Sequence, residues 1–248
     1  MLSKATIKDI QSLQHKKFRD ESHTFLAEGP KVVHELLQTA AFECVAIYGL
    51  SDWIEKEINL LPDFEKFMHV VTEFELSKLA TYATPNKVVA VFKKATVVSN
   101  IALKNNITLV LDDIQDPGNL GTIIRTADWF GIKNIICSLK TADAYNSKVV
   151  QSTMASLGNV NILYTNHIDW VKNNHSVKVL ATLLKGNALK NYKGLGEGIL
   201  LIGNEANGLC DELQQLADEK ITIPAYGNAE SLNAAIATAI VLYELKNS

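Results

Sequence analysis

The chain has 248 residues, of which 47% are hydrophobic and 21% are charged, and its formal net charge is −3. These values are ordinary for one large or two modest globular domains, and no apolar run approaches the roughly 20 residues of a membrane span. The start, MLSKATIKDIQ, lacks the apolar core and cleavage site of a secretory signal. The three cysteines form no C-x-x-C pair, so neither a disulfide nor a zinc site is expected, and the predicted location is the reducing cytoplasm.

The first 95 residues alternate between strand-like and helix-like patterns, which is typical of an α/β domain. Pro30 suits the first turn of a helix, so the stretch after TFLAEG is expected to be helical. Strands are predicted over residues 24–29, 42–49, 67–72 and 87–94, and helices over residues 2–14, 30–40, 51–58 and 73–80. The first predicted domain is residues 1–95, and residues 96–106 are the predicted linker.

The same alternation continues after the linker and places residues 107–248 in a second α/β domain. Strands are predicted over residues 107–113, 134–139, 159–165, 177–182, 198–205 and 220–225, and helices over residues 119–130, 147–157, 169–173 and 231–245. Gly131 suits a left-handed C-cap, and Gly158 suits the end of the next helix. Because the strands are almost continuously apolar, they are expected to form a parallel sheet that is covered on both faces.

Glycine mixed with Asn, Glu or Ser follows three of these strands. The stretches are DPGNLG after ITLVLDD, GNEANGL after GILLI and PAYGNAESLN after KITI. Ligands of open parallel sheets bind outside the carboxyl ends of the strands. Glycine lets the backbone approach a ligand closely, while amides and carboxylates supply directed hydrogen bonds. Helix capping explains a single loop of this kind, but three loops at equivalent strand ends favour a binding site.

Several common kinds of site find no support. The phosphate-loop pattern G-x-x-x-x-G-K-[ST] and the dinucleotide pattern G-x-G-x-x-G are absent, and GLGEG at 194–198 precedes a strand instead of following one. The six histidines are scattered and form no H-x-x-x-H or Cys/His cluster, so no metal is expected. Ser231 lies in no G-x-S-x-G elbow and has no histidine near it in sequence, which disfavours a hydrolase.

Arginine is rare in this chain. Of the 24 basic residues, only Arg19 and Arg125 are arginines. Lysine serves wherever a plain positive charge suffices, so these two positions indicate a need for the planar, bidentate guanidinium. For each of them, a surface position without a specific role is the alternative. Arg125 lies on the predicted helix that follows DPGNLG, and this places it close to the candidate site.

The three loops lie in stretches that resemble a known family. DDIQDPGNLGTIIRTADWFG, LLIGNEANGL and ITIPAYGNAESLNAAIATAIVLYEL are similar, in order and spacing, to the three motifs of SpoU-type RNA 2′-O-ribose methyltransferases in the SPOUT superfamily. KKFRDESHTFLAEGPKVVHELL resembles the small L30e-like substrate-binding domain that often precedes the catalytic domain. The resemblance implies a deep trefoil knot in the second domain and S-adenosylmethionine (AdoMet) as the cofactor. It implies an RNA ribose as the substrate, with ribosomal RNA, most often at a guanosine, favoured over transfer RNA.

The resemblance also implies roles for individual residues. The catalytic polar positions of the family fall on Asn119, Arg125, Glu205, Ser231 and Asn233. The positions whose backbone groups hold the cofactor fall on Thr182, Leu183, Gly203, Ile223 and Leu232. Because a guanidinium keeps its proton, Arg125 is expected to engage the RNA phosphate and polarise the 2′-hydroxyl, not to act as the base. Asn119 is alternatively the N-cap of its helix, and Ser231 suits both capping of the last helix and contact with the substrate.

The expected partners are RNA and a second copy of the chain. HKKFR at 15–19 is the most basic short segment; a solvated charge run is the ordinary explanation, but its place in the resemblance implies RNA contact by Lys16, Lys17 and Arg19. The last helix mixes alanines with larger apolar residues, which permits close packing. Family members dimerise near this helix, and an arginine of one subunit completes the site of the other. The alternative function is a non-catalytic RNA-binding or ribosome-assembly protein that retains the fold.

Overall fold

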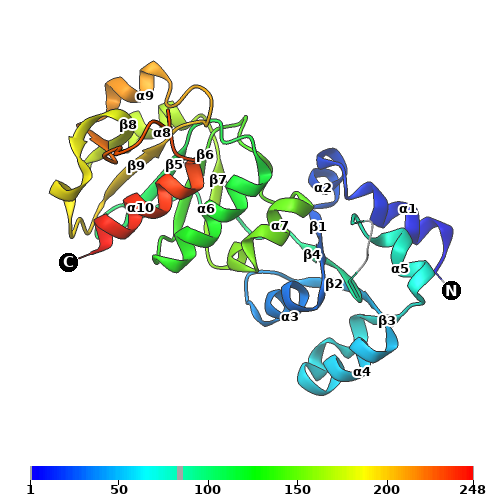
Figure 1. Cartoon of the computed structure of the whole chain (residues 1–248). Helices are drawn as coiled ribbons and strands as arrows, with labels where there is room; N and C mark the ends of the chain where they lie inside the picture. The colour runs from blue at the N-terminus through cyan, green and yellow to red at the C-terminus, as the bar shows by residue number, and fades with distance from the viewer. Residues whose placement is uncertain (1, 83–85, 248) are drawn as a thin grey trace. The chain divides into compact units, whose positions relative to one another are not determined.

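The protein is described by a computed structural model that covers residues 2–82 and 86–247 (Figure 1). Two compact units can be distinguished. The first combines Met1–Thr96 with Asp143–Asn159, and the second combines Val97–Ala142 with Val160–Ser248. Within the described ranges, every helix is too short or too polar to cross a bilayer. The trefoil knot implied by the resemblance stays a prediction.

The first unit is built on a four-stranded sheet with the order β1-β4-β2-β3. Strand β4 is antiparallel to both of its neighbours, whereas β2 and β3 are parallel. The strands are β1 (Thr24–Glu28), β2 (Cys44–Gly49), β3 (Met68–Val70) and β4 (Val88–Lys93). The helices are α1 (Lys4–Ser12), α2 (Lys16–Ser22), α3 (Pro30–Gln38), α4 (Ser51–Leu60), the 3-10 turn η1 (Pro62–Phe67) and α5 (Glu73–Leu79).

Aromatic rings fill one part of the core of this unit. Phe25 on β1 stacks with Phe92 on β4 at 5.8 Å between centroids, and Phe42 meets Phe25 edge-on at 5.1 Å. Phe25 and Phe92 are fully buried. Such pairs add about 0.5–1.5 kcal/mol each beyond the burial of their area, so β1 and β4 are held together by side chains as well as by the strand ladder.

The segment Asp143–Asn159 packs with the first unit although it follows strand β6 of the second. It contains α7 (Ser147–Thr153) and the turn η2 (Ser156–Gly158), and α7 contacts β1. The ring of Tyr145 lies 4.9 Å from that of Phe25, and its hydroxyl accepts a hydrogen bond from the Ala95 amide at 3.1 Å. The predicted domains, 1–95 and 107–248, are continuous in sequence, whereas the two compact units of the structure are not, because residues 143–159 belong to the first unit.

The second unit is a six-stranded, wholly parallel sheet with the order β10-β8-β9-β5-β6-β7. The strands are β5 (Ile107–Leu111), β6 (Asn134–Cys137), β7 (Asn161–Tyr164), β8 (Val179–Ala188), β9 (Gly198–Ile202) and β10 (Glu219–Thr222). All residues of β5 and β9 are buried, as expected for central strands that are covered on both faces.

Helices cover this sheet in two pairs. Helix α6 (Pro117–Trp129) runs beside α10 (Ala234–Lys246), and α8 (His167–Asn173) packs with α9 (Asp211–Leu216) (Figure 1). The turn η3 (Leu189–Tyr192) contacts α10. Val110 and Leu201, from the two central strands, share a core cluster with Val171 of α8 and Leu213 of α9. Side chains alternate along a strand, so the neighbouring residues of β5 and β9 face the opposite side of the sheet.

The sequence predicted all ten strands, but it missed two helices and misplaced four helix starts by two or three residues. The short helices α2 and α9 were not expected, and β8 continues six residues beyond the predicted end at Thr182. The last helix begins at Ala234 instead of Ser231, because Asn233 caps it by accepting the amides of Ala235 and Ile236 at 2.9 and 3.3 Å. The proposed capping role of Ser231 is therefore wrong.

Candidate functional site

The three glycine-containing loops meet at the carboxyl edge of the parallel sheet. Side chains from all three form one chain of hydrogen bonds: Asn119 Nδ2 donates to Glu205 Oε1, and Asn233 Nδ2 donates to Asn119 Oδ1 at 2.9 Å. Asn119 is thus the hub that ties the loop after β9 to the loop after β10. The expected convergence of these loops is confirmed.

Local capping leaves the Asn119 side chain available for this role. Helix α6 starts at Pro117, and its N-cap is Asp116, whose Oδ1 accepts the Asn119 amide at 2.8 Å. Pro117 has no amide hydrogen to satisfy and is preorganised for the first turn. Since Asp116 caps the helix, the alternative that Asn119 is the N-cap is wrong, and its amide group reaches across to the other loops.

The loop after β9 is folded back on itself so tightly that only glycine fits at its first position. A Cβ on Gly203 would lie 2.3 Å from the carbonyl carbon of Gly208 and 2.4 Å from the amide nitrogen of Leu209. The loop closes through two backbone bonds: Asn204 N donates to Gly208 O at 3.0 Å, and Gly208 N donates to Asn204 O at 2.9 Å. The requirement for glycine here is therefore steric, and the absence of a side chain lets the loop backbone close tightly on itself.

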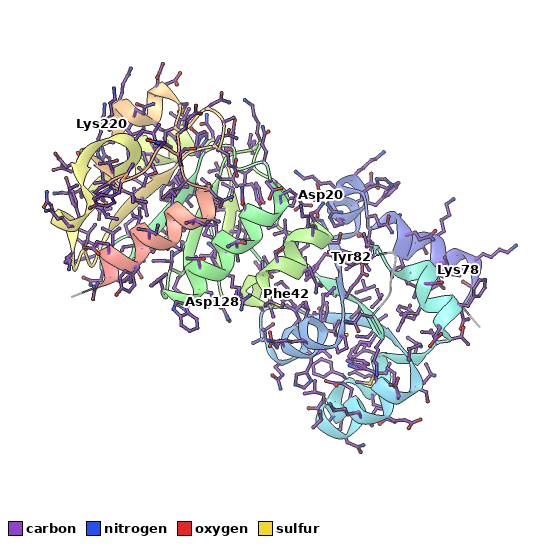
Figure 2. The ribbon with its side chains drawn as sticks, in the orientation of Figure 1. Asp20, Phe42, Lys78, Tyr82, Asp128 and Lys220 are labelled. Carbon is purple, nitrogen blue, oxygen red and sulfur yellow. The ribbon has the colours of Figure 1, made fainter. Side chains whose placement is uncertain are left out.

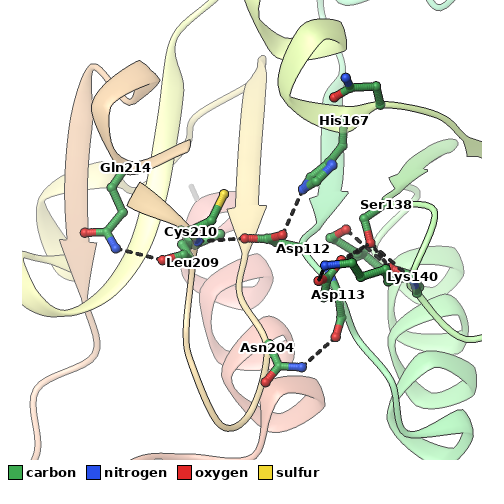
Figure 3. Close-up of polar contacts among 12 residues, drawn as sticks. Asp112, Asp113, Ser138, Lys140, His167, Asn204, Leu209, Cys210 and Gln214 are labelled. Atoms are coloured by element: carbon green, nitrogen blue, oxygen red, sulfur yellow. Dashed lines mark hydrogen bonds and ion pairs between the residues drawn. The ribbon is translucent and has the colours of Figure 1, made fainter. Parts of the chain in front are cut away.

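Asn204 fastens this loop to the end of β5 (Figure 3). Its Nδ2 donates to the carbonyl of Asp113 at 2.6 Å, while its Oδ1 accepts the amides of Ala206 and Asn207 at 2.8 and 3.2 Å. Asp113 has a left-handed backbone with φ +57°, which is uncommon for a residue with a Cβ. Its carboxylate accepts a bond from the Ser138 hydroxyl at 2.6 Å, which holds this conformation in place.

A pocket of about 1010 Å³ lies between strand β8 and the loops after β9 and β10. All five residues predicted to hold the cofactor line it: Thr182, Leu183, Gly203, Ile223 and Leu232. Glu205 and Ser231, from the predicted catalytic set, line it as well. Lys220, at the β8–β10 end of the sheet, also borders it (Figure 2). Thr182 is anchored, since its hydroxyl donates to the Leu201 carbonyl at 2.8 Å, and this bond joins β8 to β9.

The wall of the pocket at β8 owes its shape to an irregular strand. Strand β10 pairs with β8 at Leu180 and Ala181, and after a shift in register at Asn187 and Ala188. The residues between these pairs bulge out of the ladder, and they include Leu183 and Lys185 of the pocket wall. Bulges of this kind redirect side chains and are frequent beside functional sites.

Arg125 differs from the other predicted catalytic residues in its position. Its side chain is exposed on α6 and, like Asn119 and Asn233, it does not line the pocket. Among the described residues it has neither an ion pair nor a hydrogen bond through its side chain. The structure therefore places Asn119, Glu205 and Asn233 in one hydrogen-bonded group, with Ser231 on the adjoining loop and Arg125 apart from them.

A buried polar cluster supports the same edge of the sheet (Figure 3). Asp112 accepts the Cys210 amide at 2.7 Å and bonds to His167 Nε2 at 2.8 Å. Burial alone would raise the pKa of Asp112, but the bonds from His167 and Cys210 outweigh it and hold this pKa below its usual value. Burial, with the neighbouring Asp112 carboxylate, raises the pKa of the Cys210 thiol.

The Asp112 cluster was not visible in the sequence. The possible ligand atoms of Asp112, His167 and Cys210 lie within 4.8 Å of one another, although the residues are far apart in the chain. The carboxylate accepts a bond on each oxygen, and one of these bonds holds the first residue before α9. We therefore assign the cluster a structural role: it fixes the loop after β9 to the end of β5.

The predicted RNA contact of Arg19 does not fit the structure. Its side chain is 3% exposed, Nε and Nη2 donate to Asp143 Oδ2 at 3.0 and 2.6 Å, and Nη1 donates to the carbonyls of Leu13 and Gln14. The need for a planar, multiply bonding guanidinium was correctly inferred, but the fork binds the protein itself. Lys16 and Lys17 are exposed, with Lys17 paired to Glu21 at 3.9 Å, and their RNA contact stays a prediction.

Similarity to known proteins agrees with this geometry. Residues 106–243 match the SpoU rRNA Methylase family, and residues 4–90 match the MRM3-like substrate binding domain. The chain belongs to the SpoU rRNA methylase family. Its relatives include the 23S rRNA (guanosine(2553)-2′-O)-methyltransferase RlmP of Bacillus subtilis, which is 32% identical over 97% of this chain and 95% of its own length.

Solved structures are similar to this chain over nearly its whole length. The AdoMet-bound rRNA methyltransferase of Sinorhizobium meliloti is 34% identical, with a TM-score of 0.86 over 99% of this chain and 95% of that one. The SpoU methyltransferase AviRb of Streptomyces viridochromogenes, in complex with AdoMet, is 25% identical, with a TM-score of 0.84 over 98% of this chain and 97% of that one. The α/β fold with its parallel sheet is thus confirmed as that of SpoU methyltransferases.

Proposed function

We propose that this protein transfers a methyl group from AdoMet to a ribose 2′-hydroxyl of RNA, with 23S ribosomal RNA as the substrate. The observation that carries this proposal is that the loops after β9 and β10 line one pocket and are tied to each other by the Asn119 side chain. RlmP of Bacillus subtilis, which is similar over nearly the whole chain, is named as a 23S rRNA methyltransferase, and two similar solved structures contain AdoMet.

The pocket suits AdoMet in its size and its lining. A volume of about 1010 Å³ lies at the upper end of the range for small-molecule sites. Gly203 lies where the loop after β9 closes on its own backbone, and it would hold the cofactor together with Thr182, Leu183, Ile223 and Leu232. AdoMet supplies the activated methyl group. The protein must therefore bind it, orient the ribose and help the hydroxyl to lose its proton.

We assign Arg125 to the activation of the ribose 2′-hydroxyl. A guanidinium matches phosphate geometry with two parallel hydrogen bonds, and its charge would polarise a neighbouring 2′-hydroxyl. Since guanidinium groups keep their protons, the proton passes to the RNA phosphate or to water. Ser231 and Asn233 lie on the loop that would receive the ribose, and Glu205 holds Asn119 in place, which makes it a positioning residue.

A homodimer would bring Arg125 to a pocket. Helix α10 is apolar on both sides: Leu242 and Leu245 are buried, whereas Ile236 and Tyr243 are 53% and 59% exposed. A helix that is apolar all round is normally covered on all sides, so we expect a partner to cover the outer face of α10. We propose that a second copy covers it and that Arg125 of each subunit serves the pocket of the other.

The first unit would bind the RNA, because residues 4–90 match a substrate-binding domain. We assign Lys16 and Lys17 on α2 to contacts with the RNA backbone. The net charge of −3 means that such contacts depend on local patches of this kind and not on an overall field. An unpaired loop or bulge is the fitting target, because the 2′-hydroxyl must be turned out toward the pocket.

The proposal is tested by mapping ribose methylation in total RNA from cells with and without the gene. We expect one methylated position of 23S rRNA to disappear and to return when the wild-type gene is restored. Calorimetry with AdoMet separates the enzyme from a non-catalytic RNA-binding protein. Failure to bind AdoMet, together with an unchanged methylation map, would refute the proposed activity.

A further inference from the structure

An aromatic ring stands almost free at the rim of the pocket. Tyr226 is 98% exposed, and it lies in the stretch 224–233, all of whose residues are exposed. Its hydroxyl has no hydrogen-bond partner in the part of the chain that the structure describes. A solvated ring contributes little to folding, so the fold does not account for the position of this side chain.

The place of Tyr226 in the site distinguishes it from other exposed rings. Trp129 is 85% exposed and Phe74 is 69% exposed, but neither lines the pocket, whereas Tyr226 does. Along the chain, Tyr226 lies between Ile223, assigned to the cofactor, and Ser231, assigned to the substrate. The backbone that carries the ring therefore links the two halves of the proposed reaction site.

The composition of the surrounding rim suits a nucleotide. Leu184, 74% exposed, and the two cations Lys185 and Lys220 line the same pocket. Ala225 and Gly227 flank Tyr226, so no bulky neighbour in sequence crowds the faces of its ring. Aromatic rings combined with lysines are how proteins bind unpaired nucleotides, with bases on the rings and phosphates on the cations.

We propose that Tyr226 is a stacking platform for an unpaired base of the substrate RNA, at or beside the methylated nucleotide. This inference rests on the proposed function and adds a substrate-binding residue to it. Stacking would hold the target nucleotide outside its helix while the ribose faces the pocket. Because the ring is exposed at the rim, it would serve the RNA and not the cofactor.

The test compares Tyr226→Phe, Tyr226→Leu and Tyr226→Ala with the wild type. The Phe variant keeps a ring, and the Leu variant keeps apolar bulk without one. The substrate is 23S rRNA isolated from cells lacking the gene, with AdoMet at saturation. We expect the KM for RNA to stay within about twofold for Phe and to rise on the order of tenfold for Leu and Ala. The affinity for AdoMet, measured by calorimetry, should be the same in all four proteins.

Three results would overturn the inference while leaving the proposed function intact. An unchanged KM in the Ala variant would show that RNA does not use the ring. Full activity of the Leu variant would indicate apolar contact instead of stacking. A parallel loss of AdoMet affinity, or of the oligomeric state, would place the ring on the cofactor or on a second subunit. A wild-type protein that binds AdoMet but methylates no RNA would refute the proposed function, and this inference with it.

Discussion

Replacement of Arg19 by methionine should destabilise the first unit without a direct effect on RNA binding. The guanidinium of Arg19 is 3% exposed and donates four hydrogen bonds, two to Asp143 and one each to the carbonyls of Leu13 and Gln14. Methionine has a similar length but donates none of these bonds. The Asp143 side chain, 12% exposed, would then be a nearly buried charge without its partner.

Removal of one partner from a buried ion pair costs about 3–5 kcal/mol of stability. For a chain of this size, each kcal/mol corresponds to a few degrees, so Tm should fall by roughly 6–20 °C. Arg19→Lys keeps the charge, but one ammonium cannot reach the carboxylate and both carbonyls, and we expect a loss of about 1–3 kcal/mol. Arg19→Met with Asp143→Leu should recover part of the loss, because no buried charge remains, although the Tyr145 amide loses its acceptor on Asp143.

The assay is thermal unfolding followed by calorimetry or circular dichroism, with the KM for RNA measured well below the lowest Tm. The structural role of Arg19 requires a large fall in Tm, partial rescue in the double variant and an unchanged KM. If Arg19→Met left Tm within about 2 °C of the wild type and raised the KM for RNA, Arg19 would contact RNA, and the reasoning from burial would be refuted.

Four further outcomes are expected. Gly203→Ala should weaken AdoMet binding in calorimetry by about 1–3 kcal/mol, since its Cβ would meet backbone at 2.3 Å, whereas Gly196→Ala, with no atom within 4 Å, should not change it. Arg125→Ala should keep the AdoMet affinity and lower kcat roughly 100-fold or more; full turnover would contradict its role. Asp112→Asn should cost about 1–3 kcal/mol in urea unfolding at neutral pH. Folding lowers the pKa of Asp112, so its carboxylate stabilises the fold fully above pH ~4 and loses this effect as the pH falls through the pKa of the folded protein. The difference in unfolding free energy between the wild type and Asp112→Asn should therefore narrow in acid. A difference that does not change with pH would contradict this role of Asp112. Ile236→Glu should convert the proposed dimer into monomers in ultracentrifugation, and a variant that forms a dimer would exclude this face of α10 as the interface.

Local patterns were sufficient for most of the architecture. Almost continuous apolar runs predicted every strand of the parallel sheet, because a strand covered on both faces must be apolar along its whole length. The same rule predicted where the site lies, since loops at the carboxyl ends of neighbouring strands share one edge. Asn119, Glu205 and Asn233 meet there as expected, although they lie on three separate loops.

Predictions failed at positions where several local structures were equally favourable and contacts with other residues decided between them. Ser231 and Asn233 are both good N-caps by residue type, and the chain uses Asn233. The short helices α2 and α9, of seven and six residues, are below the length that holds a helix together without tertiary contacts, so their local signal was weak.

Arg19 shows the limit of sequence most clearly. From the sequence it belonged to a basic, solvated segment, whereas Asp143, 124 positions later, makes it a buried residue. Asp112, His167 and Cys210 are likewise distant in sequence, and they contact one another only because β5, α8 and the loop before α9 meet in the fold. The sequence by itself determined the strands, their apolar faces and the edge that carries the site, because these follow from periodicity and burial along the chain. Only the tertiary structure decided which polar groups are buried and which remain for a ligand, because the energy of a charge depends on what surrounds it in space.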